Sequence, residues 1–422
     1  MHNWVTRQID YVLAFSQAPI DSNVFCKLPT GFQGQDKNKR YCLRLKKNLY
    51  GTKQAAANWF EMLRDNLIDL GFTQSTIDPC LFLRCDCILI SYVDDCLVFS
   101  KDQKTIDELL IKLGQRFVLT DEGPDVSSYL GLKVEKDRGT ITLSQPALIT
   151  RILQGLSLDG DENTKVHDIP ANKVLQKDED GEERKATWNY RSIIGMMMYL
   201  ASSTRPDTLF AVHQCAKYSV FPKRCHEEAV KRIGRYLKKT RTRGTIFRPN
   251  GSNKLDCYVD ADFAGCFTQE MSHLKSSVLS RTGYIIYLSG CPIVCKSQMQ
   301  SEIALSTTEA EYIALSQSLR DLIPLRSILT ELGKIMNFKI DTPITHSTVF
   351  EDNNGALELA REPKYRPRTK HISIKYHHFR EHVKEGKIKI EHVDTNEQRA
   401  DIMTKPLEKS KFEYLRSLTL GW

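Results

Sequence analysis

Two adjacent aspartates, Asp94 and Asp95, stand between two short apolar runs and form the stretch with the clearest capacity for chemistry. The flanking residues 87–92 and 96–100 are typical of strands, so we expect a β-hairpin with the acidic pair at its tip. Two carboxylates held between apolar strands repel each other and lose hydration. A divalent cation such as Mg²⁺ relieves both costs, because it takes oxygen ligands and leaves room for water and substrate phosphates. Alone, such a pair is more often a solvated turn. Other features of the chain are therefore needed to favour a metal site over a solvated turn.

The overall composition narrows the class of protein. The chain has 422 residues, which is enough for two or three domains. No apolar run approaches the roughly 18 residues of a membrane span, and the first residues lack the apolar core of a signal peptide. A formal net charge of +8 suits a polyanionic partner such as nucleic acid. The twelve cysteines form no CxxC pair, so we expect reduced thiols in an intracellular protein, with metal binding by Cys85 and Cys87 as the less favoured alternative.

Three further features accompany the acidic pair. Asp10 lies inside an apolar run that is typical of a strand. Residues 43–54 interleave basic side chains with leucines, and residues 55–70 have helical spacing that ends at Gly71. We expect this helix to pack on the core through one stripe of side chains: Trp59, Leu63 and Leu67.

Taken together, these segments resemble the reverse transcriptases of copia-type LTR retrotransposons. The resemblance rests on the order and spacing of Asp10, residues 49–54 (Leu-Tyr-Gly-Thr-Lys-Gln), residues 78–82 (Asp-Pro-Cys-Leu-Phe) and residues 92–95 (Tyr-Val-Asp-Asp). It implies a polymerase palm domain in which Asp10 and the acidic pair hold two Mg²⁺ ions, with Mn²⁺ as the alternative metal. Paired ions about 3.5–4 Å apart stabilise both the attacking 3′-oxygen and the leaving pyrophosphate oxygen.

The same resemblance implies a nucleotide site beside these acids. Phe15 would lie under the incoming sugar and exclude a ribose 2′-hydroxyl. The other residues implied to contact the nucleotide are Tyr50, Gly51, Lys53, Gln54 and Tyr92. Two departures accompany the match. Thr52 stands where the family usually has Leu, and Asp10 comes so early that the fingers, with their basic grip on the triphosphate, are expected to be incomplete.

The segments after the hairpin are expected to reach nucleic acid. Residues 128–135 resemble the family's strand pair that holds the primer end, while an ordinary amphipathic hairpin with its turn at 137–139 is the alternative. Residues 157–188 are polar and indicate a linker or long surface loop. Residues 190–200 and 209–240 are predicted to be helical.

A basic run closes the second of these helical stretches. Such a run is usually a solvated helix face. Beside a polymerase palm, however, it lies where a thumb or connection would meet a duplex, and its side chains would release phosphate counterions and make binding salt-dependent. The residues predicted to contact nucleic acid are Lys231, Arg232, Arg235, Lys238 and Lys239.

A second group of acids begins near residue 255. Asp260 and Asp262 alternate along a predicted strand and therefore point to one face. Residues 306–309 (Ser-Thr-Thr-Glu) have the spacing of a capping box, which makes Glu309 the cap partner of a helix. Glu311, two residues further into this helix, is left without such a capping role.

Two more acids complete this group. Asp352 lies where a predicted strand runs into a helix, and Asp401 opens the last predicted helix. This order of elements and acids resembles the RNase H domain of the same retrotransposon family. The resemblance implies that Asp260, Glu311, Asp352 and Asp401 surround two Mg²⁺ ions, with Asp262 as the alternative first acid. One ion prepares a water and the other stabilises the leaving 3′-oxygen of the RNA.

Four histidines near the C-terminus offer a competing zinc hypothesis. Two of them are four residues apart on a predicted helix that runs from Ile372 to a stop at Gly386. No cysteine pair follows at finger spacing, so we favour a helix packed on the RNase H sheet. The four residues are His371, His377, His378 and His382.

We therefore predict an α/β (α+β) chain with three parts: residues 1–155 as a palm with partial fingers, 156–250 as a linker with a helical thumb and connection, and 251–422 as an RNase H-like domain. The resemblance implies an RNA-directed DNA polymerase with RNase H activity that acts on an RNA template, a DNA primer, dNTPs and the RNA/DNA hybrid. It implies that the chain has no membrane partner. Its further partners would be a second copy of the chain or other Pol segments, and its location a cytoplasmic virus-like particle or, alternatively, the nucleus. The alternative is a decayed fragment that keeps only hybrid cleavage or only nucleic-acid binding.

Overall fold

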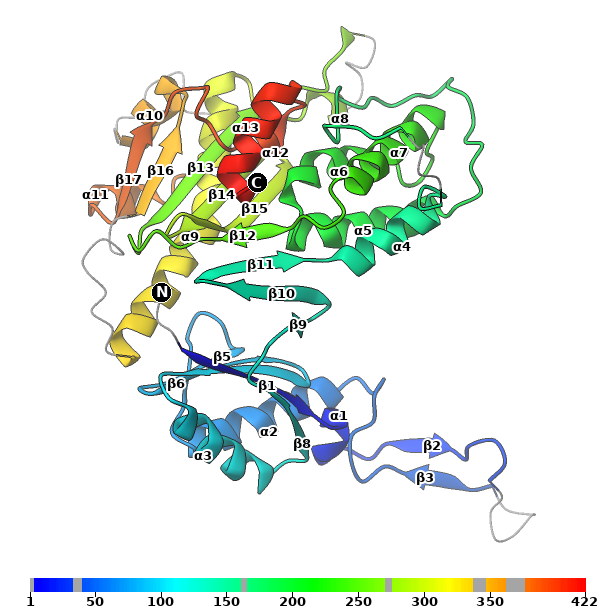
Figure 1. Cartoon of the computed structure of the whole chain (residues 1–422), viewed down its shortest axis with the longest axis vertical. Coiled ribbons are helices and arrows are strands. Elements are labelled where there is room, and N and C mark those ends of the chain that lie inside the picture. The colour runs from blue at the N-terminus through cyan, green and yellow to red at the C-terminus, as the bar shows by residue number, and fades with distance from the viewer. Residues whose placement is uncertain (1–3, 33–39, 161–164, 270–274, 337–346, 362–375) are drawn as a thin grey trace. The chain divides into compact units, whose positions relative to one another are not determined.

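Several antiparallel sheets, one mixed sheet and flanking helices make up an α/β fold, which is the class expected from the sequence (Figure 1). The computed structural model describes residues 4–32, 40–160, 165–269, 275–336, 347–361 and 376–422. The chain forms two units: unit 1 contains Ser127–Arg326 and Ile340–Trp422, and unit 2 contains His2–Val126 and Ser327–Lys339. The predicted division into three parts stays a prediction. Within the described ranges, no helix combines the length and apolar character needed to cross a membrane.

Unit 2 is built on a six-stranded antiparallel sheet. In spatial order its strands are β4 (Thr73–Gln74), β5 (Leu81–Arg84), β6 (Cys87–Tyr92), β7 (Asp95–Ser100), β1 (Val5–Tyr11) and β8 (Leu119–Gly123). Along β6 and β7 every second side chain is buried, because apolar residues occupy alternate positions and one face meets the core. The predicted hairpin is confirmed: β6 and β7 pair antiparallel, with Tyr92 opposite Asp95.

Two long helices cover one face of this sheet and bury its core (Figure 1). The helices of this part are α1 (Ala14–Gln17), α2 (Ala55–Asp69) and α3 (Gln103–Gly114), and β2 (Phe25–Lys27) and β3 (Cys42–Arg44) form a separate two-stranded ribbon. The predicted helix at α2 is confirmed: its expected stripe is at most 2 % exposed, and Gly71 follows with a left-handed φ of 86°. The stripe consists of Trp59, Leu63 and Leu67.

The first half of unit 1 combines a small sheet with a group of helices. The sheet order is β12 (Thr245–Phe247), β11 (Thr140–Ser144), β10 (Leu132–Asp137) and β9 (Ser128–Tyr129). The helices are α4 (Pro146–Gly155), α5 (Tyr190–Ser203), the short 3₁₀ helix η1 (Pro206–Thr208), α6 (Leu209–Ala216) and α7 (Arg224–Lys239). The turn expected at 137–139 is formed, since Arg138 and Gly139 connect the paired strands β10 and β11 with φ of 42° and 82°, and the primer role of this strand pair stays a prediction.

The prediction that residues 209–240 are helical throughout was wrong. The helix is broken between α6 and α7, at residues 217–223. Pro222 has no backbone N–H and disfavours the helical conformation of the residue before it. Lys223 then forms an isolated β-bridge with Glu183 of the preceding loop, which fixes the break.

The second half of unit 1 contains a five-stranded mixed sheet. Its order is β15 (Cys291–Met299), β14 (Arg281–Leu288), β13 (Leu255–Asp262), β16 (Ser347–Glu351) and β17 (Ile388–His392). β15, β14 and β13 pair antiparallel, whereas β13, β16 and β17 run parallel. The helix α9 (Thr307–Ile335) covers one face, where the Tyr284 hydroxyl donates to Asp321 Oδ2 at 2.8 Å.

Shorter helices close the rest of this sheet. They are α8 (Lys275–Val278), α10 (Asn354–Arg361), α11 (Arg380–Lys384), α12 (Asp401–Thr404) and α13 (Lys409–Leu420). The expected helix from Ile372 begins outside the described residues, and its described helical part is limited to α11. The expected last helix is also split, because Pro406 favours an extended residue before it and Lys405 has ψ of 158°.

Candidate active sites

The acidic pair of unit 2 lies where a two-residue turn, Val93 and Asp94, meets Asp95 at the start of β7. Val93, the first residue of the turn, has φ of 60°, a left-handed conformation that is uncommon for a β-branched side chain. The indole N–H of Trp59 on α2 donates to the Val93 carbonyl at 2.8 Å. The buried helix therefore holds the turn in a conformation that its sequence alone would disfavour.

Backbone pairing brings Asp10 to this turn. Asp10 on β1 lies opposite Asp95 on β7, and the next residue, Tyr11, donates its N–H to the Asp94 carbonyl at 2.9 Å. Partial burial, followed by the charge of Asp94, raises the pKa of both Asp10 and Asp95. The structure thus gathers the three predicted acids at one end of adjacent strands, where a cation would relieve their repulsion.

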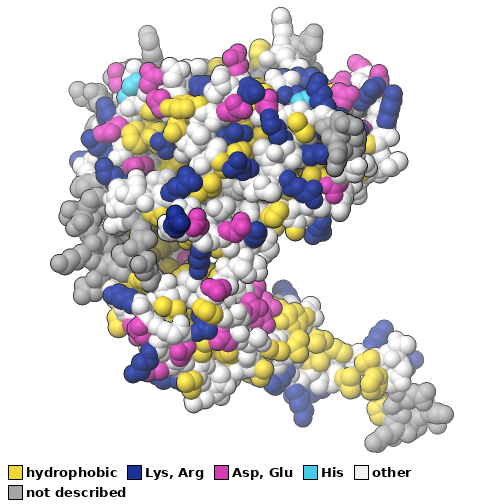
Figure 2. Space-filling view, in the orientation of Figure 1, with side chains coloured by type: hydrophobic (Ala, Val, Ile, Leu, Met, Phe, Trp, Pro, Cys, Tyr) yellow, Lys and Arg dark blue, Asp and Glu magenta, His cyan; other side chains and the backbone are white. Residues whose placement is uncertain are grey.

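The aromatic pair of the predicted nucleotide site also meets in unit 2. The rings of Phe15 and Tyr50 lie 4.5 Å apart between centroids, at an interplanar angle of 31°. Tyr92 is 58 % exposed at the hairpin, and Tyr50 is 45 % exposed. Figure 2 shows hydrophobic side chains gathered along α1 and the β2–β3 ribbon. These faces are available to a stacked base or sugar.

The loop before α2 carries the remaining predicted nucleotide contacts. Gly51 has φ of 95°, a conformation that favours glycine, and Lys53 is exposed. Gln54 occupies the N-cap position of α2, and its amide donates to Ser22 Oγ at 3.1 Å. The structure leaves Lys53 free to approach an anion, while Gln54 helps to fix the loop.

The second acid group lies in unit 1 and is much tighter. Ligand atoms of Asp260, Glu311 and Asp352 all lie within 4.8 Å of one another, and this is the only such group of three in the part of the chain that the structure describes. β13 and β16 are parallel neighbours, so Asp260 and the residue after β16 reach the same region of the sheet. Glu311 is added from the first turns of α9. Asp262 does not join this group, although burial raises its pKa.

Asp401 joins the group through lysines. Asp401 is fully buried, and its two carboxylate oxygens contact Lys405 Nζ at 2.7 Å and Lys411 Nζ at 2.6 Å. Lys405 Nζ also lies 3.7 Å from Asp260 Oδ2, which accepts a hydrogen bond from the Thr404 hydroxyl. A cationic side chain therefore lies between two of the predicted acids.

Glycine allows α12 to approach closely enough to supply these residues. A Cβ at Gly283, which pairs with Asp260 across β13 and β14, would lie 2.6 Å from Thr404 Cγ2 and 2.7 Å from Met403 Cβ. Such a distance forces a shift of the backbone, so a larger residue would move α12 and with it Asp401.

Burial dominates the electrostatics of this cluster. It raises the pKa of Asp260 to about 7, with Asp401 and Asp352 adding to the effect against the opposing charge of Lys405. Burial, followed by mutual repulsion with Glu351, raises the pKa of Glu311 well above its usual value. Hard carboxylate oxygens in one small buried space are the donors that Mg²⁺ or Mn²⁺ takes.

Two residues of this cluster were missed from the sequence. Glu351 at the end of β16 is fully buried, and its Oε2, like that of Glu311, has no hydrogen-bond partner among the described residues. Burial raises its pKa well above the usual value. Lys405 is the second missed residue, and it lies between Asp260 and Asp401. An acid beside Asp352 and a lysine four residues after Asp401 were the available signals, but neither shows burial by itself.

The expected cap of α9 is formed with one difference. Ser306 Oγ accepts from the Glu309 N–H at 3.2 Å, as a capping box requires. The Glu309 carboxylate accepts from the N–H of Leu305 at 2.8 Å instead of that of Ser306. Glu309 is thus engaged in the start of the helix, and Glu311 remains free to face the acid group.

Two of the histidines considered for zinc, His377 and His378, contact α9. His377 Nδ1 is 2.7 Å from the Tyr312 hydroxyl, and His378 Nδ1 is 3.5 Å from Ser316 Oγ. His382 Nδ1 is buried without a hydrogen-bond partner among the described residues. His371 lies outside the described residues.

The five basic residues predicted on α7 fall into two groups: three have partners within the protein and two line a cavity. Lys231 Nζ pairs with Glu227 at 2.5 Å, Lys238 Nζ donates to the Leu158 carbonyl at 2.9 Å, and Lys239 pairs with Asp168. Figure 2 shows Lys and Arg spread among acids over the visible face of unit 1. The other two basic residues, Arg232 and Arg235, line a cavity.

Comparison with known proteins gives a family for the first part of the chain and relatives for nearly all of it. Residues 1–171 match the family described as reverse transcriptase (RNA-dependent DNA polymerase). The chain is 32 % identical over 419 residues to the Retrovirus-related Pol polyprotein from transposon RE1 of Arabidopsis thaliana, covering 98 % of this chain and 27 % of that protein. Over nearly its whole length this chain is thus similar to the Pol polyproteins of copia-type retrotransposons, and residues 1–171 carry a reverse transcriptase domain.

Two further Pol relatives are also similar over nearly the whole of this chain. The Pol polyprotein from transposon TNT 1-94 of Nicotiana tabacum is 33 % identical over 97 % of this chain and 30 % of its own length. The truncated transposon Ty1-A Gag-Pol polyprotein of Saccharomyces cerevisiae is 27 % identical over 98 % of this chain and 34 % of its own length. The chain thus spans about a third or less of these Pol relatives. Reverse transcriptases act on nucleic acid and generally use divalent metals, and the acid group of unit 1 is suited to one.

Proposed function

We propose that this Pol segment has two Mg²⁺-dependent activities, RNA-directed DNA synthesis in unit 2 and cleavage of the RNA strand of an RNA/DNA hybrid in unit 1. The observation that carries the proposal is the presence of a separate group of carboxylates in each unit. When bound, a pair of divalent cations activates the attacking oxygen and stabilises the leaving oxygen in each reaction.

In unit 2 the residues supply both the metal ligands and the nucleotide platform. Asp10, Asp94 and Asp95 would hold the cations against the primer end and the triphosphate. Phe15 and Tyr50, already in contact, would bind the sugar and base of the incoming dNTP through their exposed faces. The backbone pairing of β1 with β7 keeps the acids in place when the substrate enters.

In unit 1 the residues would bind the scissile phosphate of the hybrid. Asp260, Glu311 and Asp352 would hold a cation in the buried group, and Asp401 would complete the site. Lys405 carries a positive charge between Asp260 and Asp401, so it balances these acids before the metal binds. We infer that the RNA template, DNA primer and hybrid reach both sites in the setting of a larger polyprotein, inside cytoplasmic virus-like particles.

A second candidate is a segment that cleaves hybrids but does not extend primers. It is favoured by one observation: the acids of unit 1 form a tight cluster, whereas those of the unit 2 hairpin are not among the groups of three that lie within 4.8 Å in the described chain.

Activity assays on the full chain test these candidates. Primer extension on an RNA template and cleavage of a labelled RNA/DNA hybrid should both occur with Mg²⁺ or Mn²⁺, and EDTA should abolish both. Cleavage without extension would support the second candidate. Loss of both activities in well-folded protein with either metal would overturn the proposal.

A further inference from the structure

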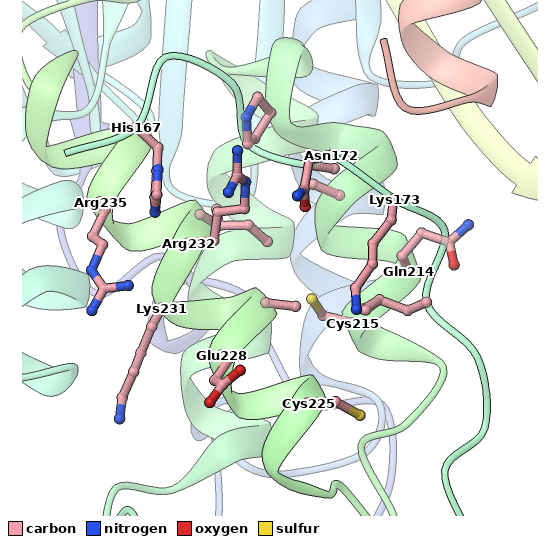
Figure 3. A pocket seen from close by; sticks show the side chains of 16 residues that line it. His167, Asn172, Lys173, Gln214, Cys215, Cys225, Glu228, Lys231, Arg232 and Arg235 are labelled. Atoms are coloured by element: carbon pink, nitrogen blue, oxygen red, sulfur yellow. The ribbon is translucent and has the colours of Figure 1, made fainter. Parts of the chain in front are cut away.

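A cavity of about 440 Å³ in unit 1 has no role in the two acid sites. It lies between α7, α6 and the loop segment 167–175, as Figure 3 shows. Its volume falls within the roughly 300–1,000 Å³ of small-molecule sites. All of its lining residues belong to the same unit, so the cavity is a feature of a single packed body.

One wall of the cavity is cationic. His167, Arg232 and Arg235 lie on the same side in Figure 3, with Lys231 below them. No described carboxylate pairs with Arg232 or Arg235, and the Nε atom of each is buried without a hydrogen-bond partner among the described residues. Guanidinium groups bind phosphate through paired N–H donors, so this wall has unused capacity for an anion.

The lowered pKa of His167 reflects burial together with the same concentration of positive charge. Burial lowers its pKa, and the charges of Arg232 and Arg235 lower it further. Burial also lowers the pKa of Arg232. A dianionic group placed between these side chains would offset their mutual repulsion.

The opposite wall is suited to a heterocyclic base. Asn172, Lys173 and Gln214 lie on that side in Figure 3, and their amides offer both donors and acceptors. The lining also has an apolar part, which includes Ala211, Ala229 and Ile233. Glu228 is exposed and paired with Arg224 at 3.3 Å, so it does not neutralise the cationic wall.

We propose that this cavity binds a 5′-nucleotide, with the phosphate on Arg232 and Arg235 and the base against the amide wall. The ligand is either a free nucleoside monophosphate or the 5′-phosphorylated end of a nucleic-acid strand, since both present the same group. The site is separate from the proposed catalysis, and its binding does not require a metal.

Calorimetric titration of the full chain in EDTA tests the proposal, because chelation removes metal-dependent binding at the acid sites. The probes are dAMP, deoxyadenosine and inorganic phosphate. We expect one dAMP per chain, with deoxyadenosine and phosphate each weaker by about tenfold or more, since each lacks one half of the recognised group. Binding of deoxyadenosine or of inorganic phosphate with the same affinity as dAMP would overturn the proposal.

Matched variants locate the binding. The double variant Arg232→Gln/Arg235→Gln should weaken dAMP by about tenfold or more. The control Lys185→Gln/Arg191→Gln removes the same charge from exposed positions that do not line the cavity and should retain dAMP affinity. Ala229→Leu fills the cavity without changing charge and should also weaken dAMP. Unchanged affinity in both cavity variants would refute the assignment.

Two oligonucleotides of one sequence separate the sources of the ligand. If a strand end is bound, a short 5′-phosphorylated DNA should compete with dAMP better than its 5′-hydroxyl counterpart. If the two DNAs compete equally while dAMP still requires Arg232 and Arg235, the ligand is the free nucleotide. Either result supports the nucleotide site. Failure of dAMP binding in folded wild-type protein, confirmed by circular dichroism, would end it.

Discussion

The acid groups of the two units hold their carboxylates by different means. In unit 2, Asp10 and Asp95 are partly exposed and are placed by strand pairing, with no ion-pair partner among the described residues. In unit 1, Asp260 and Asp401 are at most 2 % exposed and are placed beside Lys405. The comparison teaches that backbone pairing fixes an open site, whereas a buried site depends on compensating charge. Changes of charge should therefore affect the two units unequally.

The largest expected difference between the two units concerns ion pairs that lie outside the acid groups. Arg205 and Asp207 in unit 1 are 0 % exposed and lie 2.8 Å apart, whereas Arg7 in unit 2 pairs at 3.3 Å with the exposed Asp107 and Asp121. Arg205→Ala should cost about 3–5 kcal/mol, because it leaves the buried Asp207 carboxylate without a compensating positive charge. Arg7→Ala should cost about 1 kcal/mol or less. Hydrogen exchange of each unit measures both, and equal losses would break the comparison.

The next prediction concerns pH. Burial, followed by the charges of Arg281 and Lys296, lowers the pKa of His213 in unit 1 from 6.5 to about 4. The unfolded chain then takes up the proton first, so unit 1 should lose about 2–3 kcal/mol as the pH falls through that window. His213→Gln should remove this loss.

Unit 2 contains no histidine among its described residues and serves as the internal control. Hydrogen exchange between pH 7 and pH 4 would follow both units. If unit 1 of the His213→Gln variant still loses this stability on acidification, the assignment of the pH dependence to His213 is refuted.

Lys405→Met tests whether the buried acids need their cation. Without metal the variant should lose about 2 kcal/mol, because Asp260 and Asp401 lose a neighbouring positive charge. Added Mg²⁺ should restore part of this stability by binding the folded state. Lys409→Met, at an exposed lysine that contacts Asp168, is the matched control and should leave stability nearly unchanged. Urea unfolding with and without Mg²⁺ measures these effects.

The smallest effect is expected at the turn of unit 2. Val93→Gly should raise the stability of unit 2 by about 0.5–1 kcal/mol, because φ of 60° costs a β-branched residue more than it costs glycine. Val118→Gly, at an exposed position with ordinary backbone, should lower it by about as much as glycine usually costs, roughly 0.5–1 kcal/mol. Thermal unfolding distinguishes the two, and destabilisation by both would show that Val93 is not strained.

Much of the fold followed from periodicity and local chemistry. Strand alternation and the acidic tip predicted the β6–β7 hairpin, and the stripe of Trp59 predicted α2. The four acids of unit 1 were selected by resemblance, and the structure brings three of them within one small space. The resemblance also favoured Asp260 over Asp262, a choice that strand alternation alone cannot make, and the group in the structure contains Asp260.

The features that were missed depend on tertiary contacts. Glu351 differs from a surface acid only because β16 is central in its sheet, and Lys405 reaches the cluster only because Gly283 admits α12. The break between α6 and α7 had a local signal in Pro222, which the helical spacing on both sides outweighed in the prediction.

The most direct test of two independent sites is a crossed assay of Asp94→Asn and Asp352→Asn in the full chain. Asp94→Asn should lower primer extension by about a thousandfold or more and leave hybrid cleavage within about twofold, and Asp352→Asn should do the reverse, since each removes one metal ligand. Asp65→Asn, at an exposed carboxylate, is the control and should spare both activities. Equal loss of both activities in both variants would contradict the account.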